Sequence, residues 1–385
     1  MGKSSQVRIL FTGGGSGGHV YPLLAVGEVL KKIAVANGII LALYYMGPRD
    51  EYSEIISASG FQIKTVVSGK LRRYFSLDNL IDLPKFFIGF FDALFKLFVL
   101  MPDVIFSKGG TGALPVVLAG WFYRIPVIIH ESDAIPGLTN LVSAWFAKRV
   151  AVSFERALEY FNPKKAVLIG TPIRKEMLEA KPDAGAAKKE LGFAENAPLL
   201  LVLGGSQGAV RLNNFILANL ENLLKETQVF HQTGQANFTE VEKLSRAALS
   251  NIPPSAAVKY RYRAIPYLDL VTEKNAFAAA DLVLTRAGSN TIAEIAAFAK
   301  PAIIVPLKEA ANNHQRVNAY EFANGGAAAV VEETNLLPGI FLNQLKEIIH
   351  NPAVMDKMSR ASGKFFKPGA AETIAQEILR LANGN

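Results

Sequence analysis

The first candidate for chemistry is a glycine-rich loop that ends in a histidine, Gly13-Gly14-Gly15-Ser16-Gly17-Gly18-His19. It follows the apolar run 7–11 and precedes the periodic segment 20–33, a pattern that predicts strand, turn and helix. Glycines let a ligand approach the main chain, and free N–H groups at the start of the next helix favour an anion. Because the unperturbed pKa of histidine is close to neutrality, His19 is a candidate general base beside that anion, although a lone histidine is more often structural.

The same loop formally matches G-x-G-x-x-G, the fingerprint of dinucleotide sites. That fingerprint requires an acidic residue at the end of the second strand, where it holds a ribose. The second strand is expected over residues 39–46, and Asp50 and Glu51 come too late to fill that place. The sequence therefore argues against a nicotinamide or flavin site, and the fingerprint leaves His19 unexplained.

Three further sets of polar residues stand at candidate ligand positions in the second half. Ser206 follows the apolar run 199–203 and two glycines, where a helix N-cap could hold a phosphate or act only as a cap. Ser289 and Asn290 open another predicted helix, and Glu294 could accept two ribose hydroxyls or only stabilise the helix dipole. His314-Gln315 follows a polar loop and could bind sugar hydroxyls or simply face water.

The composition narrows the chemistry that this chain can perform. It has 385 residues, a formal net charge of +8 and no cysteine, which excludes disulfides, thiolate metal sites and cysteine nucleophiles. The five histidines lack the spacing of a metal site, so we expect no protein-bound metal and no cofactor. The positive charge suits an anionic partner, but it is spread along the chain, which argues against nucleic acid. Residues 1–8 are polar and lack the apolar core of a signal peptide.

Hydrophobic patterning predicts an α/β chain of two Rossmann-like, doubly wound parallel-sheet domains facing a cleft, since the length exceeds one ordinary core. The expected strands are 7–11, 39–46, 62–67, 104–106, 127–130, 149–152 and 166–168, then 199–203, 229–232, 282–285 and 303–305. Turn residues at 162–165 and 170–172 place the domain boundary here. We therefore expect an N-terminal domain of residues 1–165, a C-terminal domain of residues 166–368, and a final helix within 369–385 that packs back on the N-terminal domain. Ligands of such sheets bind beyond the carboxyl ends of the strands.

The most hydrophobic tract, residues 86–101, contains Phe86, Phe87, Phe90 and Phe91. Charged residues interrupt it, so it is not expected to span a membrane. Apolar residues occupy nearly every side of the predicted helix, more than one buried face requires. With Arg72 and Arg73 upstream, the helix could lie on an anionic membrane surface, or it could belong to the core; residue types alone favour neither.

Six motifs occur in an order known from one family. They are Gly13–His19, Ser107–Gly112, His130-Glu131 with Ile135–Asn140, Gly204–Ala209, Arg286–Ser289 with Glu294, and His314-Gln315 with Asn318. Over nearly its whole length the chain resembles the MurG family, the bacterial UDP-N-acetylglucosamine–undecaprenyl-pyrophosphoryl-muramoyl-peptide N-acetylglucosaminyltransferases. The resemblance implies the GT-B arrangement of two Rossmann-like domains. It also implies inverting transfer of N-acetylglucosamine from UDP-N-acetylglucosamine to the muramoyl 4-hydroxyl of lipid I, which gives lipid II for peptidoglycan synthesis.

The resemblance carries roles to individual residues, with His19 as the catalytic base. The implied donor site consists of Ser16, Gly17, Gly18, Asp133, Arg174, Ser206, Leu268, Ser289, Asn290, Thr291, Ile292, Ala293, Glu294, His314 and Gln315. The implied acceptor site consists of Gly13, Gly14, Gly15, Lys108, Gly109, Gly110, Thr111 and Asn140. In the donor site, Ser206 and Arg174 would contact phosphate and Glu294 the ribose, while a main-chain contact near Leu268 would hold the uracil.

The aromatic tract matches the family's membrane-docking region in position and character. The resemblance therefore favours the surface interpretation of Phe86, Phe87, Phe90 and Phe91, together with Arg72 and Arg73. It implies a peripheral protein on the cytoplasmic side of the bacterial cell membrane. It leaves open a contact with other cell-wall synthesis proteins.

One departure from the family pattern concerns the residues after His130. The family usually has Glu-Gln-Asn, whereas this chain has Glu131-Ser132-Asp133. Asp133 accepts hydrogen bonds but cannot donate them when ionised, and it adds a negative charge near a diphosphate unless a cation or His19 compensates. It could pair with His19, alter donor preference or be a tolerated near-isostere. The alternatives to the main hypothesis are another GT-B transferase with a lipid acceptor such as diacylglycerol, and an inactive UDP-sugar-binding protein.

Overall fold

The computed structural model describes residues 6–67, 78–205, 208–250, 261–310 and 313–384, and only the backbone of 78–83. The chain divides into two compact units, which we describe separately. Unit 1 comprises Met1–Arg174 and Lys367–Asn385, and unit 2 comprises Lys175–Phe366.

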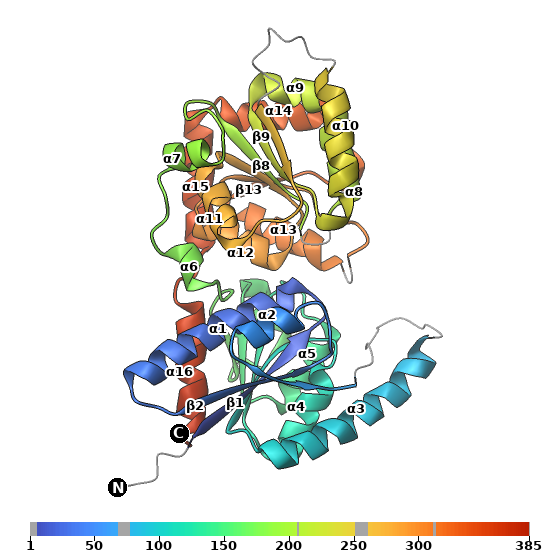
Figure 1. Ribbon diagram of the computed structural model, residues 1–385, viewed down its shortest axis with the longest axis vertical. Helices are drawn as coiled ribbons and strands as arrows, with labels where there is room; N and C mark the ends of the chain where they lie inside the picture. The colour runs from blue at the N-terminus through green and yellow to red at the C-terminus, as the bar shows by residue number, and fades with distance from the viewer. Residues whose placement is uncertain (1–5, 68–77, 206–207, 251–260, 311–312, 385) are drawn as a thin grey trace. The chain divides into compact units, whose positions relative to one another are not determined.

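Unit 1 is built on a seven-stranded sheet of order β3-β2-β1-β4-β5-β6-β7, in which every ladder is parallel (Figure 1). Its strands are β1 (Val7–Gly14), β2 (Leu41–Gly47), β3 (Gln62–Thr65), β4 (Val104–Gly110), β5 (Val127–Glu131), β6 (Arg149–Val152) and β7 (Ala166–Leu168). Its helices are α1 (Gly17–Ala36), α2 (Ser53–Ala58), α3 (Asp78–Leu100), α4 (Ala113–Phe122), α5 (Leu138–Phe146), the 3₁₀ helix η1 (Glu155–Tyr160) and α16 (Ala370–Ala382).

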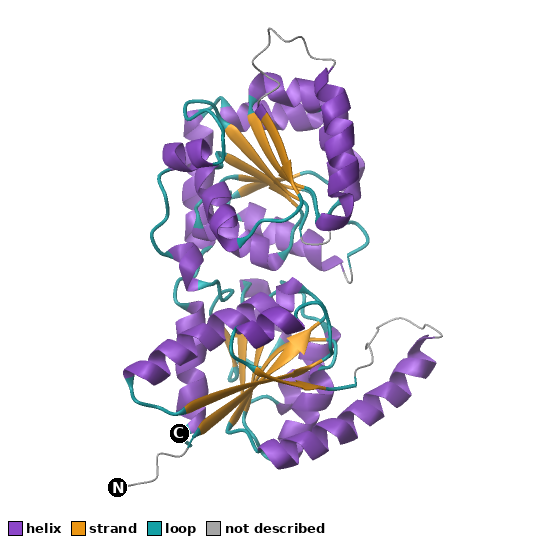
Figure 2. Ribbon diagram, in the orientation of Figure 1, coloured by secondary structure: helices purple, strands orange, loops and turns teal. Residues whose placement is uncertain are grey.

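Alternate residues of the unit 1 strands serve two different cores. Ile9 and Phe11 of β1 pack with α1 and α16 on one face of the sheet. Leu10, between them, packs with α3, α4 and α5 on the other face. Successive strand side chains point to opposite faces, and a parallel sheet covered on both faces therefore reads as a continuous apolar run (Figure 2).

Unit 2 repeats this design with six parallel strands of order β10-β9-β8-β11-β12-β13. Its strands are β8 (Leu199–Leu203), β9 (Gln228–Gln232), β10 (Tyr262–Ile265), β11 (Leu282–Thr285), β12 (Ala302–Ile304) and β13 (Ala328–Val330). Its helices are α6 (Lys175–Leu178), α7 (Ala184–Glu190), α8 (Val210–Ala218), α9 (Leu220–Glu226), α10 (Phe238–Ser250), α11 (Leu270–Ala279), α12 (Ser289–Ala297), α13 (His314–Asn324), α14 (Pro338–Ile349), α15 (Pro352–Phe365) and the 3₁₀ helices η2 (Gln235–Asn237) and η5 (Glu333–Asn335).

In both sheets the strand order reverses at the strand that opens the unit. The reversal lies between β1 and β4 in unit 1 and between β8 and β11 in unit 2. Ligands of doubly wound sheets bind beyond the carboxyl ends of the strands at such a switch point. The loops that follow these four strands are the glycine motifs singled out in the sequence, so the topology brings the candidate residues together in pairs of loops.

The division between the units differs from the expected boundary after residue 165. Strand β7 is the edge strand of the unit 1 sheet, and the unit continues to Arg174. Helix α16 returns to unit 1, where Ile374 and Ile378 join the core around α1. Two strands were not among those expected, because β10 alternates polar and apolar residues and β13 is a short run rich in alanine.

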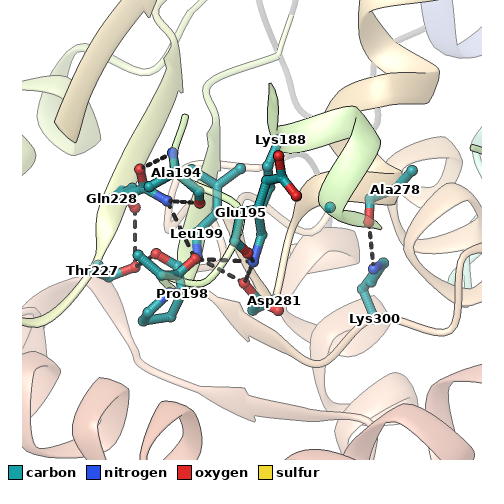
Figure 3. Close-up of polar contacts among 12 residues, drawn as sticks. Lys188, Ala194, Glu195, Pro198, Leu199, Thr227, Gln228, Ala278, Asp281 and Lys300 are labelled. Carbon is teal, nitrogen blue, oxygen red and sulfur yellow. Dashed lines mark hydrogen bonds and ion pairs between the residues drawn. The ribbon is translucent and has the colours of Figure 1, made fainter. Parts of the chain in front are cut away.

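A buried polar cluster closes the amino ends of β8 and β11 in unit 2 (Figure 3). Lys188 Nζ lies 2.7 Å from Asp281 Oδ2, and the same carboxylate oxygen accepts the Leu199 N–H at 2.8 Å. Lys300 Nζ donates to the Ala278 carbonyl at 2.9 Å, and burial lowers the pKa of this lysine to about 8. The cluster lies at the strand ends opposite the glycine loops, so its polar groups stabilise the sheet and not the candidate site.

Candidate active site

The two glycine loops of unit 1 touch at the switch point of the sheet. Gly14 of β1 pairs with Gly110 of β4 after a register shift in the ladder. Gly110 has φ +82°, and a Cβ there would lie 2.6 Å from the Gly14 carbonyl oxygen and 3.2 Å from the His19 ring. Only glycine allows both the left-handed backbone and this approach. The contact places His19, from the start of α1, beside the loop after β4.

His19 is partly exposed, and its Nδ1 lies 2.9 Å from the hydroxyl oxygen of Ser16. If Nδ1–H donates to Ser16, the lone pair is on Nε2, which can then accept a proton. Ser16 is the N-cap of α1 and makes no side-chain cap to the helix, so its hydroxyl is used for the histidine. This arrangement has the geometry of an oriented base.

Two residues of the β2 region shape the first glycine loop, and the sequence analysis assigned neither to the site. The Tyr45 hydroxyl donates to the Gly13 carbonyl, and burial raises the pKa of this tyrosine. Asp50 Oδ2 accepts the Gly15 N–H at 3.2 Å. Asp50 therefore fixes the loop. A tyrosine within an apolar strand gives no sequence signal of such a contact.

The turn after β5 is organised around the buried carboxylate of Glu131. Its Oε1 accepts the Asp133 N–H at 2.9 Å, and its Oε2 accepts the Gly137 N–H at 3.1 Å. Asn140 Nδ2 also donates to Oε2, at 2.9 Å. Burial raises the pKa of Glu131, the neighbouring Asp133 raises it further, and Lys108 acts in the opposite direction. Glu131 therefore fixes the turn that presents Asp133 and Asn140.

Lys108 is 1% exposed, and its Nζ donates to the Ser132 hydroxyl at 2.8 Å. Burial lowers the pKa of Lys108, while Glu131 and Asp133 raise it. The structure thus gives this lysine an internal contact, and its expected acceptor contact stays a prediction. Thr111, at the end of the same loop, lies beside Gly15, since a Cβ on that glycine would be 3.2 Å from the Thr111 hydroxyl.

His130, a residue of β5, is fully buried and neutral. Its Nε2–H donates to the Gly170 carbonyl at 2.9 Å, which ties β5 to the segment that leads out of unit 1. Burial and the adjacent Lys108 hold the pKa of His130 well below its usual value. Arg174, at the end of that segment, lies with its guanidinium 4.9 Å from the ring centre of Tyr21. The expected phosphate contact of Arg174 stays a prediction.

In unit 2 the loop after β11 leads directly into α12. Ser289 is buried at the first position of this helix, and the Asn290 Oδ1 atom is buried without a hydrogen-bond partner in the described part of the chain. Asn318 of α13 donates to the Ala287 carbonyl at 3.2 Å, which holds the loop in place. A helix N-terminus with an unpartnered polar atom suits an anionic or polar ligand.

The remaining unit 2 candidates have more varied surroundings. Ile292 and Ala293 are buried on the inner side of α12, whereas Thr291 and Glu294 are half-buried. Gln315 Oε1 accepts the Leu307 N–H at 3.1 Å, so the side chain also fixes the loop after β12. His314 begins α13, and Leu268 is buried directly before the N-cap of α11. Ser206 and the pair Arg72 and Arg73 lie outside the described residues.

An ion-pair chain, which the sequence analysis missed, joins two helices and two loops at the carboxyl edge of the unit 2 sheet. Glu333 pairs with Arg286 of the loop after β11 and, at 2.6 Å, with Arg211 of α8. Arg211 also reaches Glu309 at 2.9 Å in the loop after β12. The Arg286 and Glu333 side chains are only 11% and 9% exposed, so this pair is the buried part of the ion-pair chain. It holds the Arg286 loop against η5.

Among the described residues, no group of three or more His, Asp or Glu side chains could hold a metal ion. Thr12, His130, Asn140 and Ser143 each have a buried polar side-chain atom without a partner in that same part of the chain. All four belong to unit 1, near the carboxyl ends of β1 and β5 or in α5. The expectation that the protein needs no metal stays a prediction.

Comparison with known proteins places this fold and these loops in a family. The model of the glycosyltransferase family 28 N-terminal domain matches residues 9–152, and that of the C-terminal domain matches residues 199–374. The UDP-N-acetylglucosamine–N-acetylmuramyl-(pentapeptide) pyrophosphoryl-undecaprenol N-acetylglucosamine transferase of Clostridium tetani is 37% identical over 89% of this chain and 90% of its own length. Enzyme 2 of that name from Bacillus cereus is 36% identical over 96% of this chain and 99% of its own.

Solved structures agree with this result. MurG of Acinetobacter baumannii superposes with a TM-score of 0.74 at 25% identity, covering 98% of this chain and all of that one. A UDP-GlcNAc 2-epimerase from Neisseria meningitidis shares the fold alone, with a TM-score of 0.66 at 13% identity over 98% of this chain and all of its own. The two doubly wound units and the two family matches define a glycosyltransferase of the GT-B type. The chain belongs to glycosyltransferase family 28 and, within it, to the MurG family of N-acetylglucosamine transferases.

The contact between the two glycine loops of unit 1 can be tested with alanine. Gly110→Ala adds a Cβ against the Gly14 carbonyl and the His19 ring at a residue with φ +82°, where an L side chain costs about 1–2 kcal/mol. We expect at least a tenfold loss of transferase activity. Gly137→Ala is the matched control, because nothing lies within 4 Å of its Cβ and its φ is −66°. Equal losses in the two variants, measured as kcat/KM, would contradict the assigned contact.

The ion-pair chain of unit 2 can be tested through stability. Glu333→Gln removes the carboxylate that Arg286 and Arg211 share, and we expect the free energy of unfolding to fall by about 1–3 kcal/mol. Glu332→Gln is the neighbouring control, since Glu332 pairs with the exposed Arg316 and should change stability by less than about 0.5 kcal/mol. Denaturant unfolding of both variants measures the difference. A loss of stability in Glu333→Gln no larger than that of the control would show that the ion-pair chain does not fix these loops.

Proposed function

We propose that this chain transfers N-acetylglucosamine from UDP-N-acetylglucosamine to the muramoyl 4-hydroxyl of an undecaprenyl-pyrophosphoryl muramoyl pentapeptide, with inversion. The observation that carries the proposal is identity of 36–37% with enzymes named for this transfer, over about nine-tenths of the chain or more. The product is the disaccharide-linked lipid II used in peptidoglycan synthesis. The two switch points provide a polar site in each unit for this chemistry.

Unit 2 would bind the UDP-sugar. The N-terminus of α12 presents free N–H groups to the diphosphate, and Asn290 Oδ1 is a buried acceptor in need of a donor group. Glu294, about one turn into the helix, would accept the ribose hydroxyls. Gln315, whose Oε1 is fixed by Leu307, keeps its amide N–H groups for the sugar.

Unit 1 would bind the acceptor pyrophosphate and supply the base. The loops 13–19 and 108–112 lie side by side at the switch point, where the start of α1 would offer main-chain N–H groups to a phosphate. His19 stands at the start of α1, where its Nε2 would take the proton of the 4-hydroxyl as that oxygen attacks the anomeric carbon. The helix N-termini, with Arg174, would balance the charge of the departing UDP without a metal ion.

The proposal is tested by transfer of labelled N-acetylglucosamine to a short-chain lipid I analogue, with and without a chelator. The wild-type protein should turn over in both conditions. His19→Ala should lower kcat by about 10²–10⁴, the usual effect of removing a general base, while the KM for UDP-N-acetylglucosamine changes little. Tight binding of the UDP-sugar without transfer would contradict the acceptor assignment. Turnover that stops on chelation would contradict the metal-free mechanism.

We further propose that the same unit docks on an anionic membrane surface through an apolar face of α3. The exposed large apolar residues of this helix follow helical spacing: Phe87, Ile88, Phe91, Phe95, Phe98 and Val99. The opposite side, with Ala93 and Leu97, packs against α4 in the core. The helix thus buries one apolar face and leaves another in contact with solvent.

Aromatic residues of α4 and α5 extend this exposed face. Phe98 lies next to Tyr123, whose ring contacts Phe122, and both Trp121 and Trp145 are more than half exposed. Among the described residues no helix is both long and apolar enough to cross a bilayer. An apolar face with aromatic residues suits insertion at the lipid interface, where their flat rings are favoured.

Docking is tested by sedimentation with vesicles rich in phosphatidylglycerol. Phe91→Ser, Phe95→Ser and Phe98→Ser together remove exposed aromatic area without opening the core, so vesicle binding should fall at least tenfold. Turnover of a water-soluble acceptor should be retained. The control is Val271→Ser with Leu337→Ser, two exposed apolar residues of unit 2. Vesicle binding that is equal in the triple variant and in the control would contradict the assigned face.

A further inference from the structure

A turn with two carboxylates, one buried and one half-buried, lies beside the glycine loops of unit 1. Glu131 and Asp133 are two residues apart, and Glu131 is 4% exposed. Burial raises the pKa of Glu131, and repulsion from the nearby Asp133 raises it further. The cation that offsets the repulsion is Lys108, which comes from the adjacent strand β4.

We propose that Lys108 is a positioning residue, an internal counter-ion that holds the Glu131–Asp133 turn in place beside the glycine loops. The inference rests on the proposed transferase function and deepens it. It assigns Lys108 a role through the turn and not through direct contact with the acceptor. It also answers how an aspartate can stand at position 133, near the place where a diphosphate would bind.

Geometry supports an internal role. The Lys108 side chain is 1% exposed, and its ammonium donates to the Ser132 hydroxyl at 2.8 Å, inside the turn. The stem of the lysine runs beneath the first glycine loop, since a Cβ on Gly13 would lie 3.3 Å from the Lys108 Cβ. Lys108 therefore links the turn after β5 to the loop after β1. An ammonium that bound a substrate phosphate would have to leave this enclosed position.

The charges that face this ammonium explain why it stays inside. Glu131 and Asp133 both favour the charged form of Lys108, and they oppose the effect of burial. His130, on β5, is held neutral by burial and by Lys108 itself, so it adds no competing positive charge. Other titratable groups near the loops are His19, whose ring lies beside Gly110, and Asp50 and Tyr45, which contact the loop after β1. Lys108 is thus a buried cation that faces both carboxylates of the turn.

A double-mutant cycle tests this pairing. The variants are Lys108→Met, Asp133→Asn and the double variant, with Lys164→Met, an exposed lysine of the same unit, as control. Lys108→Met should lower kcat/KM at least tenfold and move the acid limb of its pH profile to higher pH. The sign follows because Lys108 lowers the pKa of Glu131, so its removal lets the carboxyl protonate at a higher pH. The double variant should recover most of the activity and return the limb towards its wild-type position.

Lys108→Gln provides a second test, because it keeps a hydrogen bond to Ser132 and removes only the charge. It should show the same shift of the acid limb and the same rescue by Asp133→Asn. Losses that simply multiply in the double variants would overturn the proposal. A rise in the KM for the acceptor with an unchanged pH profile would also overturn it, and would make Lys108 a substrate contact.

Thermal unfolding of the same proteins separates this inference from the proposed function, since it needs no substrate. Lys108→Met should lower Tm by about 3 °C or more at pH 7.5, and adding Asp133→Asn should restore part of that loss. A coupling seen in Tm without any transferase activity would support the counter-ion and refute the function. Additive Tm changes in an active enzyme would refute the counter-ion and leave the function intact.

Discussion

The structure depends on one close contact, the approach of the Gly110 backbone to the carbonyl of Gly14 at the point where the strand order of unit 1 reverses. No side chain fits between the ends of these two strands. The loops after β1 and β4 can therefore lie side by side, and the His19 ring can lie on the second loop. A phosphate at this edge would meet the start of α1 beside both loops, which is the basis of the acceptor site proposed here.

The two units fix the loops at the carboxyl edges of their sheets with different kinds of polar contact. Both place loops at the carboxyl edge of a doubly wound sheet, where backbone groups lack partners within the sheet. Unit 1 fixes its loops with the buried hydrogen bond that Tyr45 donates to Gly13 and with N–H groups that donate to the Glu131 carboxylate. Unit 2 fixes its loops with the partly exposed ion-pair chain through Glu333 and with the amide of Asn318. We expect salt to loosen the unit 2 loops more than those of unit 1, because exposed ion pairs are screened.

Much of the fold could be predicted from the sequence, because its signals are local. Most of the eleven expected strands are apolar runs, since a strand covered on both faces has no polar side. Strands β10 and β13 were missed, because the first alternates with polar residues and the second has only three residues. The expected boundary lay inside unit 1, because turn residues flank β7 and nothing local shows that this strand joins the preceding sheet.

The site was predicted in part for a similar reason. Glycine loops and helix N-termini follow from spacing, and the structure places them at the two switch points. The partners of Tyr45, Asp50, Lys108 and Glu333 did not follow, because each of these side chains contacts residues on another strand or loop. Asp133 shows the limit most clearly. The sequence predicted a need for a compensating cation, and only the packing of β4 beside β5 indicates Lys108.

The central claim is that the two units divide the substrates between their switch points. Amide hydrogen exchange of the full-length protein, with each substrate added separately, tests it most directly. UDP-N-acetylglucosamine should slow exchange at residues 288–294 and 313–316 of unit 2, and a soluble lipid I analogue should slow it at 13–20 and 108–112 of unit 1. A donor that leaves the unit 2 segments unchanged would contradict the account.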